Sequence, residues 1–206
     1  RENFEVFGYA LAGDDGSDNF RVIASGCDHM IDTRPLSLEQ FAGRIAIPYL
    51  NITGGVGWQK FLAIDDEDVK YAQQAGGQTR LYNLKALSVP GDTLVLCEGE
   101  FDTISLTALG IPAVGIPGAQ NWKPHFHRVL QGYDRVVMFY DDDEPGRGLV
   151  KTIKAKIPDL VPLAPPRGHH DVGEAFAAGL GDVIRALVKG ENVDDRDEPG
   201  EERIPY

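Results

Sequence analysis

The sequence predicts an α/β fold, in which a parallel sheet carries helices on both faces and a smaller α+β segment precedes it. From about residue 91, short apolar segments alternate with segments that are apolar at helical spacing, as crossover connections between parallel strands require. The apolar run V-V-M-F at 136–139 is typical of a strand buried on both faces. The 24 glycines and 13 prolines among 206 residues favour many tight turns over a helical bundle.

The first 90 residues are expected to contribute antiparallel hairpins. Residues 4–11 and 20–24 are strand-like and flank a polar Gly/Asp turn, which favours a hairpin. A short helical start is expected at 37–40. Residues 44–50 and 58–64 lie on either side of a Gly-rich turn and predict a second hairpin.

The second half is expected to supply the parallel sheet and its covering helices. Strands are predicted at 93–97, 113–116, 135–140 and 160–163, and helices at 101–109, 122–130, 149–157, 172–178 and 183–188. These elements divide the chain into an N-terminal segment (1–90), an α/β domain (91–190) and an acidic tail (191–206). The tail has seven acidic and two basic residues with little apolar content, so it is expected to be disordered.

Composition narrows the class of protein further. No apolar run is long enough to cross a membrane. No apolar leader follows Arg1, so no signal peptide is expected and the chain is interpreted as an internal part of a longer one. Two cysteines without a C-x-x-C motif exclude a disulfide framework and a zinc ribbon in this chain, and favour a reducing, cytoplasmic compartment.

The net charge of −12 means that any contact with nucleic acid must depend on a local basic strip or on bound metal. The tail accounts for −5 of this charge, and the remaining residues are still acidic.

Carboxylates follow two of the predicted parallel strands. Glu98 ends one strand, and Asp141 and Asp143 follow another, where alternation makes these two aspartates point the same way. Asp102 lies one helical turn after Glu98, and Asp171 opens the closing helices. Because ligands of parallel sheets sit at the carboxyl ends of the strands, these five side chains are predicted to converge.

An oxygen-only site of this kind predicts Mg²⁺ or Mn²⁺, with two ions suited to phosphoryl transfer. Glu98, Asp141 and Asp143 are interpreted as functional, because three carboxylates at two strand ends have no structural need. Asp142, Glu144 and Glu100 are instead interpreted as helix-capping or solvated residues. A receiver domain also carries carboxylates at strand ends, but the order of acidic residues here fits it poorly.

The motif E-G-E-F-D at 98–102, followed by D-D-D-E-P-G-R at 141–147, resembles the TOPRIM domain shared by DnaG-type primases, topoisomerases and certain nucleases. The resemblance implies a TOPRIM-type parallel sheet, with Glu98, Asp141 and Asp143 as catalytic and metal-binding residues and with Asp102 and Asp171 supporting the metal.

The upstream half resembles the subdomain that precedes TOPRIM in DnaG-type primases, in the order G-R-I-A-I-P-Y, G-V-G-W-Q-K, K-Y and L-Y. The segments at 115–122 and 171–174 are closer to phage and organellar primase-helicase proteins. This likeness covers about residues 43–190. It implies a basic strip that binds the template or nucleotides and is formed by Arg44, Lys60, Lys70, Tyr71 and Arg80, the last in place of a lysine that the family has.

The resemblance therefore implies the catalytic core of a phage DNA primase, which makes short RNA primers on single-stranded DNA with two Mg²⁺ or Mn²⁺ ions. The implied partners are the DNA template, ribonucleoside triphosphates, and a replicative helicase or a separate zinc-binding subunit. No zinc is expected in this chain, and no membrane partner. Two alternatives stay open: a TOPRIM-type metal-dependent nuclease, and a non-catalytic module that binds nucleic acid or a helicase.

Overall fold

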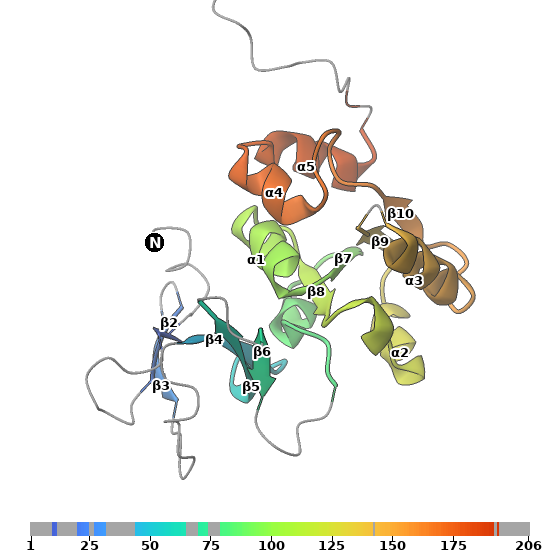
Figure 1. Ribbon diagram of the computed structural model, residues 1–206. Coiled ribbons are helices and arrows are strands. Elements are labelled where there is room, and N and C mark those ends of the chain that lie inside the picture. The colour runs from blue at the N-terminus through green and yellow to red at the C-terminus, as the bar shows by residue number, and fades with distance from the viewer. Residues whose placement is uncertain are drawn as a thin grey trace, which may run out of the picture.

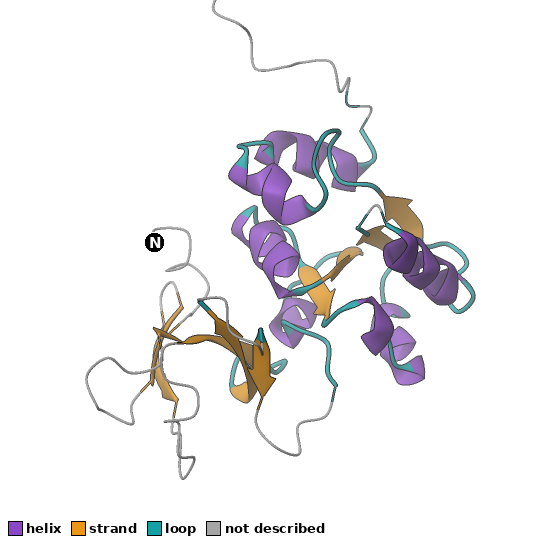
Figure 2. Ribbon diagram, viewed as in Figure 1, coloured by secondary structure: helices purple, strands orange, loops and turns teal. Residues whose placement is uncertain are grey.

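A computed structural model describes residues 10–11, 20–24, 27–31, 44–64, 70–73, 79–141, 143–191 and 193 (Figure 1). For residues 10–31 it describes only the backbone pairing. The predicted helical start at 37–40 and the acidic tail, apart from 191 and 193, lie outside the described residues. Figure 2 shows that the helices gather around one sheet, whereas the other sheets lie to one side of it.

The larger half is built on a four-stranded parallel sheet, as the apolar strands predict. Its strand order is β10-β9-β7-β8, and all three pairings are parallel. Its strands are β7 (Thr93–Glu98), β8 (Ala113–Ile116), β9 (Arg135–Phe139) and β10 (Val161–Leu163). Since β7 is central and pairs with both β8 and β9, the residues that end it are flanked by the ends of two other strands.

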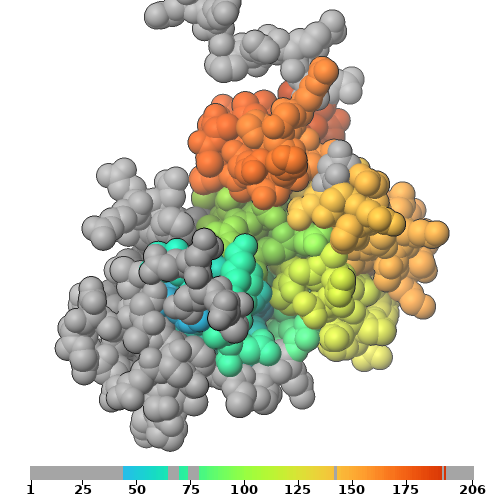
Figure 3. All heavy atoms as spheres, in the orientation of Figure 1, coloured from blue at the N-terminus to red at the C-terminus, as the bar shows by residue number. Residues whose placement is uncertain are grey.

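Helices cover both faces of this sheet. Leu94 and Leu96 of β7 pack with α2 and α3, while Val95 and Cys97 pack with α1, α4 and α5 on the opposite face. This alternation on fully buried strands explains their continuous apolar sequence. In the space-filling view, α4 lies next to α1, and α4 in turn contacts α5 (Figure 3). The helices are α1 (Glu100–Ala108), α2 (His127–Leu130), α3 (Glu144–Lys154), α4 (Val172–Ala177) and α5 (Gly181–Lys189).

None of the helices in the described part of the chain is long and apolar enough to span a membrane.

The smaller half contains an antiparallel sheet of order β1-β4-β5-β6 and a separate pair, β2-β3. Its strands are β1 (Ala10–Leu11), β2 (Phe20–Ala24), β3 (Cys27–Ile31), β4 (Arg44–Leu50), β5 (Val56–Ala63) and β6 (Tyr71–Gln73). The β4–β5 hairpin confirms the second predicted hairpin. The first predicted hairpin is not found among the described residues, where β1 pairs with β4 and β2 pairs with β3; the rest of its first strand, residues 4–9, lies outside them. A turn composition signals a bend, but it does not select the partner of the strand before it.

The two halves are joined through backbone and side chains. Tyr82 pairs with Gly115 at the edge of β8, with Tyr82 N donating to Gly115 O at 2.8 Å. Ile47 and Tyr49 of the smaller sheet pack with Tyr82 and with Ile104 of α1. The predicted boundary at residue 91 stays a prediction, although residues before it contribute to the larger core through the 3₁₀ turn η3 (Leu84–Ser88).

Two helix predictions had wrong bounds for reasons of proline chemistry. A helix was expected over 122–130, but the chain forms a 3₁₀ turn, η5 (Pro124–Phe126), before the single turn of α2. Lys123 is held extended (φ −111°, ψ 140°), as residues before proline prefer, so no helix runs through it. Conversely, α3 begins at Glu144, five residues before the predicted start, because Pro145 suits a first helical turn and Asp143 caps it.

Gly115 allows α1 to pack closely on β8. A Cβ at this position would lie 2.3 Å from Thr103 Oγ1 and 2.6 Å from Gly99 O. Moving the Gly99 carbonyl away would cost contacts, because it accepts a hydrogen bond from Thr103 Oγ1 at 2.7 Å and the Gly99 N–H donates to Ile116 O at 2.8 Å. Any side chain at 115 therefore forces α1 and the turn after Glu98 away from the sheet.

The substitution G115A is expected to lower the free energy of unfolding by about 2 kcal/mol, because overpacking here displaces backbone. Urea unfolding monitored by circular dichroism measures this loss. The matched control is G132A, since a Cβ at Gly132 meets nothing within 4 Å and φ there is not positive. Equal stabilities of the two variants would contradict the close approach of α1 to β8.

Candidate functional site

The carboxyl ends of β7 and β9 meet at one edge of the parallel sheet. Cys97 of β7 pairs with Phe139 of β9, so Glu98 at the end of β7 and Asp141 just beyond β9 lie at the same edge. Besides burial, the Glu98 charge contributes to raising the pKa of Asp141, and both charges contribute to raising the pKa of the neighbouring Asp102. The structure thus brings together two carboxylates that are 43 positions apart in the chain.

Glu98 is held in place by the loop that follows β8. Its Oε1 accepts a hydrogen bond from the backbone N–H of Ala119 at 2.9 Å. Its Oε2 is buried, and no described residue donates a hydrogen bond to it. A buried carboxylate oxygen without a donor is costly unless a cation or a proton satisfies it.

The aspartate turn after β9 is fixed by the start of α3. Asp143 caps this helix, because its Oδ1 accepts from Gly146 N at 2.7 Å. A Cβ at Gly146 would lie 2.2 Å from Asp141 O, so glycine is needed for the helix to approach the turn. Asp143 therefore has a structural role that occupies one of its two oxygens. Asp142, predicted to turn aside, lies outside the described residues.

Asp102 and Asp171 meet at the beginning of α4. Asp102 Oδ1 accepts from Gly173 N at 2.9 Å, and Asp171 caps the helix by accepting from Glu174 N at 2.7 Å. A Cβ at Gly173 would stand 3.4 Å from Asp102 Oδ1 and 3.2 Å from Asp171 Oδ1. The glycine lets the α4 backbone reach the buried Asp102.

Crowding and burial raise the pKa of the central carboxyls. Burial first, then the charges of Asp171, Asp141 and Glu98, raise the pKa of Asp102 to about 8, against a lowering by the Gly173 N–H. Burial, followed by the charges of Glu98, Asp171 and Asp143, raises the pKa of Asp141 to about 7. The pKa of Glu98 is also raised, mainly by burial. Neighbouring carboxylates that destabilise one another's charged forms are typical of cation sites.

The donors fit a hard divalent cation. They are carboxylate oxygens, the ligands that Mg²⁺ and Mn²⁺ prefer, and Glu98 Oε2 is buried without a donor. Within the described ranges, no three acidic, histidine or cysteine side chains stand close enough together to form a ready metal site. Binding of an ion would therefore draw these carboxylates closer than the structure has them.

The predicted basic strip is divided between buried and exposed positions. Arg44 is buried, with 7% of its surface exposed. Lys60 is largely buried and forms an ion pair, at 2.7 Å, with Glu100. Lys70, Tyr71 and Arg80 are exposed. The Lys60 and Lys70 ammonium groups lie 4.0 and 5.8 Å from the centre of the Tyr71 ring.

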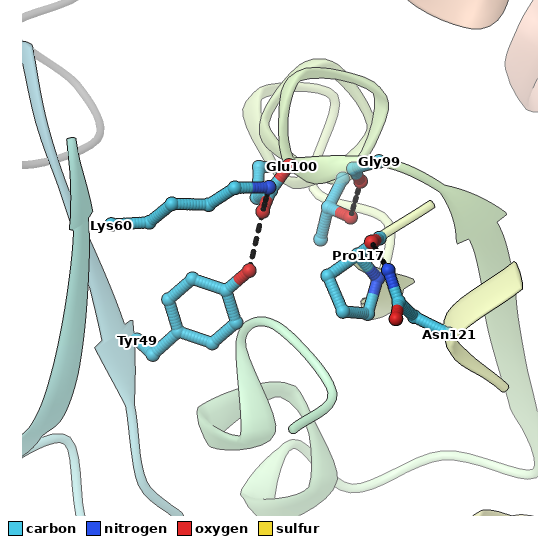
Figure 4. A network of polar contacts seen from close by, with 7 residues as sticks. Tyr49, Lys60, Gly99, Glu100, Pro117 and Asn121 are labelled. Atoms are coloured by element: carbon cyan, nitrogen blue, oxygen red, sulfur yellow. Dashed lines mark hydrogen bonds and ion pairs between the residues drawn. The ribbon is translucent and has the colours of Figure 1, made fainter. Parts of the chain in front are cut away.

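The interpretation of Glu100 as a helix-capping or solvated residue was wrong, since Gly99 is the N-cap of α1 and Glu100 is buried. Only 3% of its surface is exposed, and it accepts hydrogen bonds from Tyr49 and Lys60 of the smaller sheet (Figure 4). Burial and then the Glu100 charge raise the pKa of Tyr49, so the phenol keeps the proton that it donates. The sequence signal was the spacing of four from Ile104, which places both residues on the helix face that meets the smaller sheet.

Comparison with known proteins identifies the class of the α/β domain. Residues 95–170 match the Toprim-like family model. The primase fragment of the bacteriophage T7 primase-helicase protein superposes with a TM-score of 0.56 at 21% identity, covering 70% of this chain and 62% of that one. A DnaG primase catalytic domain bound to single-stranded DNA superposes with a TM-score of 0.58 at 19% identity, covering 73% of this chain and 52% of that one.

These likenesses establish that the chain has the fold of DnaG primase catalytic cores, as the sequence motifs predicted, while it spans between half and two thirds of those solved chains. A phage relative identifies the family. The Gene 57 protein of Mycobacterium phage D29 is 36% identical over 132 residues, which cover 62% of this chain and 87% of that protein. The chain belongs to the same family as this phage protein.

In metal-free buffer, the free energy of unfolding is expected to fall as pH rises from about 4 to about 8. The pKa of Asp102 is about 8 in the folded protein against an ordinary 3.8, so the folded state binds an extra proton in this range and loses that advantage at higher pH. Urea unfolding across this range measures the slope. Mn²⁺ is expected to raise Tm more at about pH 8 than at about pH 6, where protons compete for the carboxylates.

D102N is expected to reduce that pH dependence, since the neutral amide has no proton to lose, and the remaining slope comes from Asp141 and Glu98. The exposed Asp159 provides the control, because D159N should leave the slope unchanged. Stability that rises between about pH 6 and 8 would contradict the crowding of carboxyls at this edge.

K60M is expected to lower the free energy of unfolding by roughly 3 kcal/mol, because it leaves the Glu100 charge buried without its cation. Thermal and urea unfolding measure the loss. The control is D182N, which breaks the exposed Asp182–Arg185 pair and should cost less than about 0.5 kcal/mol. A K60M protein as stable as D182N would show that the Glu100 charge is satisfied by other groups.

Proposed function

We propose that this chain is the catalytic core of a phage DNA primase, a nucleotidyltransferase that joins ribonucleotides into short primers on single-stranded DNA. The observation that carries the proposal is the position of the exposed Lys70 and Tyr71. The Tyr71 ring contacts the Lys60 ammonium, and Lys60 forms an ion pair with Glu100, which lies two positions after Glu98 of the acidic edge. A metal-dependent nuclease needs only the acidic edge, whereas a polymerase also needs a surface that holds the strand and nucleotide beside it.

In this proposal Glu98, Asp141 and Asp143 hold the cations, with Asp102 and Asp171 supporting them. Bound Mg²⁺ or Mn²⁺ would lower the pKa of the attacking 3′ hydroxyl and offset charge on the leaving pyrophosphate. The protein contributes a fixed frame, since backbone N–H groups of Ala119, Gly146 and Gly173 orient the carboxylates. A carboxyl with a pKa near 7, such as Asp141, is deprotonated readily when a cation binds.

The strand-binding role falls to the exposed residues of the predicted strip. Lys70 offers a compact charge to a phosphate, Arg80 a planar fork, and Tyr71 an aromatic face on which a base stacks. Lys60 is engaged by Glu100, and Arg44 is buried, so we assign them supporting rather than direct contacts. A localised basic surface of this kind can bind nucleic acid although the net charge of the chain is −12, because phosphate contacts depend on the nearest cations.

The proposed partners are inferred from two of the similar solved structures. The DnaG domain bound to single-stranded DNA and the T7 protein that joins primase to helicase support a DNA template and a helicase as partners of this chain as well. Ribonucleoside triphosphates are the proposed substrates, a zinc-binding subunit is the alternative partner for template recognition, and the cytoplasm of the infected host is the proposed compartment.

Extension of a short labelled RNA annealed to single-stranded DNA, with Mn²⁺ and ribonucleoside triphosphates, tests this proposal without depending on recognition of an initiation sequence. We expect elongated RNA, and D141N should reduce its rate by about 100-fold or more by removing a cation ligand. E144Q, at an exposed neighbouring position, is the control and should remain active.

Two outcomes would contradict the proposal. Shortening of a labelled template that depends on Asp141 would identify a nuclease. Absence of both products would favour a non-catalytic module, provided that binding of Mn²⁺ and DNA by the same preparation has been verified.

A further inference from the structure

Glu100 is a buried acid that the proposed chemistry does not use. It is the first residue of α1, yet its side chain turns to the smaller sheet, where Tyr49 of β4 and Lys60 of β5 donate hydrogen bonds to the same oxygen, Oε1 (Figure 4). The Lys60–Glu100 distance is 2.7 Å, and both side chains are largely removed from water. The contact links the smaller sheet to α1 through three polar groups on different elements.

The contact continues to the proposed strand-binding surface. The Lys60 ammonium that reaches Glu100 also lies 4.0 Å from the centre of the Tyr71 ring. Tyr71 belongs to the edge strand β6, which pairs only with β5 among the strands described, and 37% of its surface is exposed. The position of this ring against β5 therefore depends on where Glu100 holds the lysine.

On the other side, the contact continues to Glu98 through a fixed backbone. Gly99 separates the two acids with φ +105°, a conformation that L side chains rarely adopt. Its N–H donates to Ile116 O at 2.8 Å, and its carbonyl accepts from Thr103 Oγ1 at 2.7 Å. The Gly99 backbone therefore holds Glu98 and Glu100 at a fixed separation.

A buried ion pair is a poor way to gain stability, because well-packed apolar side chains of similar size often serve as well. What an ion pair with hydrogen bonds provides instead is one defined arrangement of its groups. Here that arrangement fixes Glu100 relative to Tyr49 and Lys60, between the acidic edge and the aromatic surface. A polymerase must hold a strand at a set distance from its cations at this place.

Building on the function proposed above, we infer that Glu100 is a positioning residue: through Lys60 it fixes the Tyr71 surface relative to Glu98, so that a bound strand reaches the acidic edge in register. Lys60 thus acts on the strand through Tyr71, and its ammonium is retained by Glu100.

The test separates geometry from stability by replacing the whole network with apolar groups. The triple variant Y49F/K60M/E100M leaves no buried charge and no phenol without an acceptor, so it is expected to stay as stable as the wild type in urea. D182N, which breaks an exposed pair on α5, is the matched control.

We expect the triple variant to bind Mn²⁺, measured by electron paramagnetic resonance, within about 2-fold of the wild type, because its carboxylates are intact. Its KM for the RNA-primed template should rise about 10-fold with a smaller change in kcat, since the strand is held less accurately. Amide hydrogen exchange at Tyr71–Gln73 should become about 10-fold faster as β6 loses its anchor.

A stable triple variant with unchanged KM and unchanged exchange at β6 would overturn the inference and leave the network a structural contact only. The exchange measurement does not require enzymatic activity. If the wild type makes no primers, the proposed function fails, while faster exchange at β6 in the triple variant would still support the link between Glu100 and Tyr71.

Discussion

The constraint on which the site depends is that parallel strands end at a common edge, so their terminal carboxylates are forced together despite their mutual repulsion. Glu98 and Asp141 follow adjacent strands and cannot separate without breaking the β7–β9 pairing. The protein tolerates this because backbone N–H groups hold individual oxygens, as Ala119 does for Glu98 and Gly173 does for Asp102. Burial, and after it the charges of the neighbouring carboxylates, raises the pKa values of Asp102 and Asp141.

Glycines are what allow those N–H groups to come close enough. Gly146 brings α3 against the Asp141 carbonyl, Gly173 brings α4 against Asp102, and Gly115 lets α1 settle on β8. Each occupies a place where a Cβ would displace backbone or a carboxylate. The high glycine content that first indicates tight turns thus also serves helix approach, which places positive helix ends around negative side chains.

A second contact on which the arrangement depends is that between the smaller sheet and α1. Its core is apolar, with Ile47 packed against Ile104, but its centre is the charged pair of Lys60 and Glu100. Lys60 contacts the Tyr71 ring, and Glu100 follows Glu98 by two positions, so this pair connects the acidic edge with the exposed aromatic surface. Family membership with a phage protein and the fold of DnaG primase cores are consistent with such a connection, which neither half would provide alone.

The sequence by itself determined the parallel sheet, the bounds of most of its strands and the edge at which Glu98 and Asp141 meet, because the apolar pattern of each segment and the alternation of strands with helices can be read locally. It also indicated the β4–β5 hairpin through its glycine-rich turn. Only the tertiary structure decided that β1 pairs with β4, that Arg44 is buried, and that Glu100 binds Lys60 across 40 positions of chain. A residue's charge is written in the sequence, but whether water or another side chain satisfies that charge depends on which distant elements pack against it.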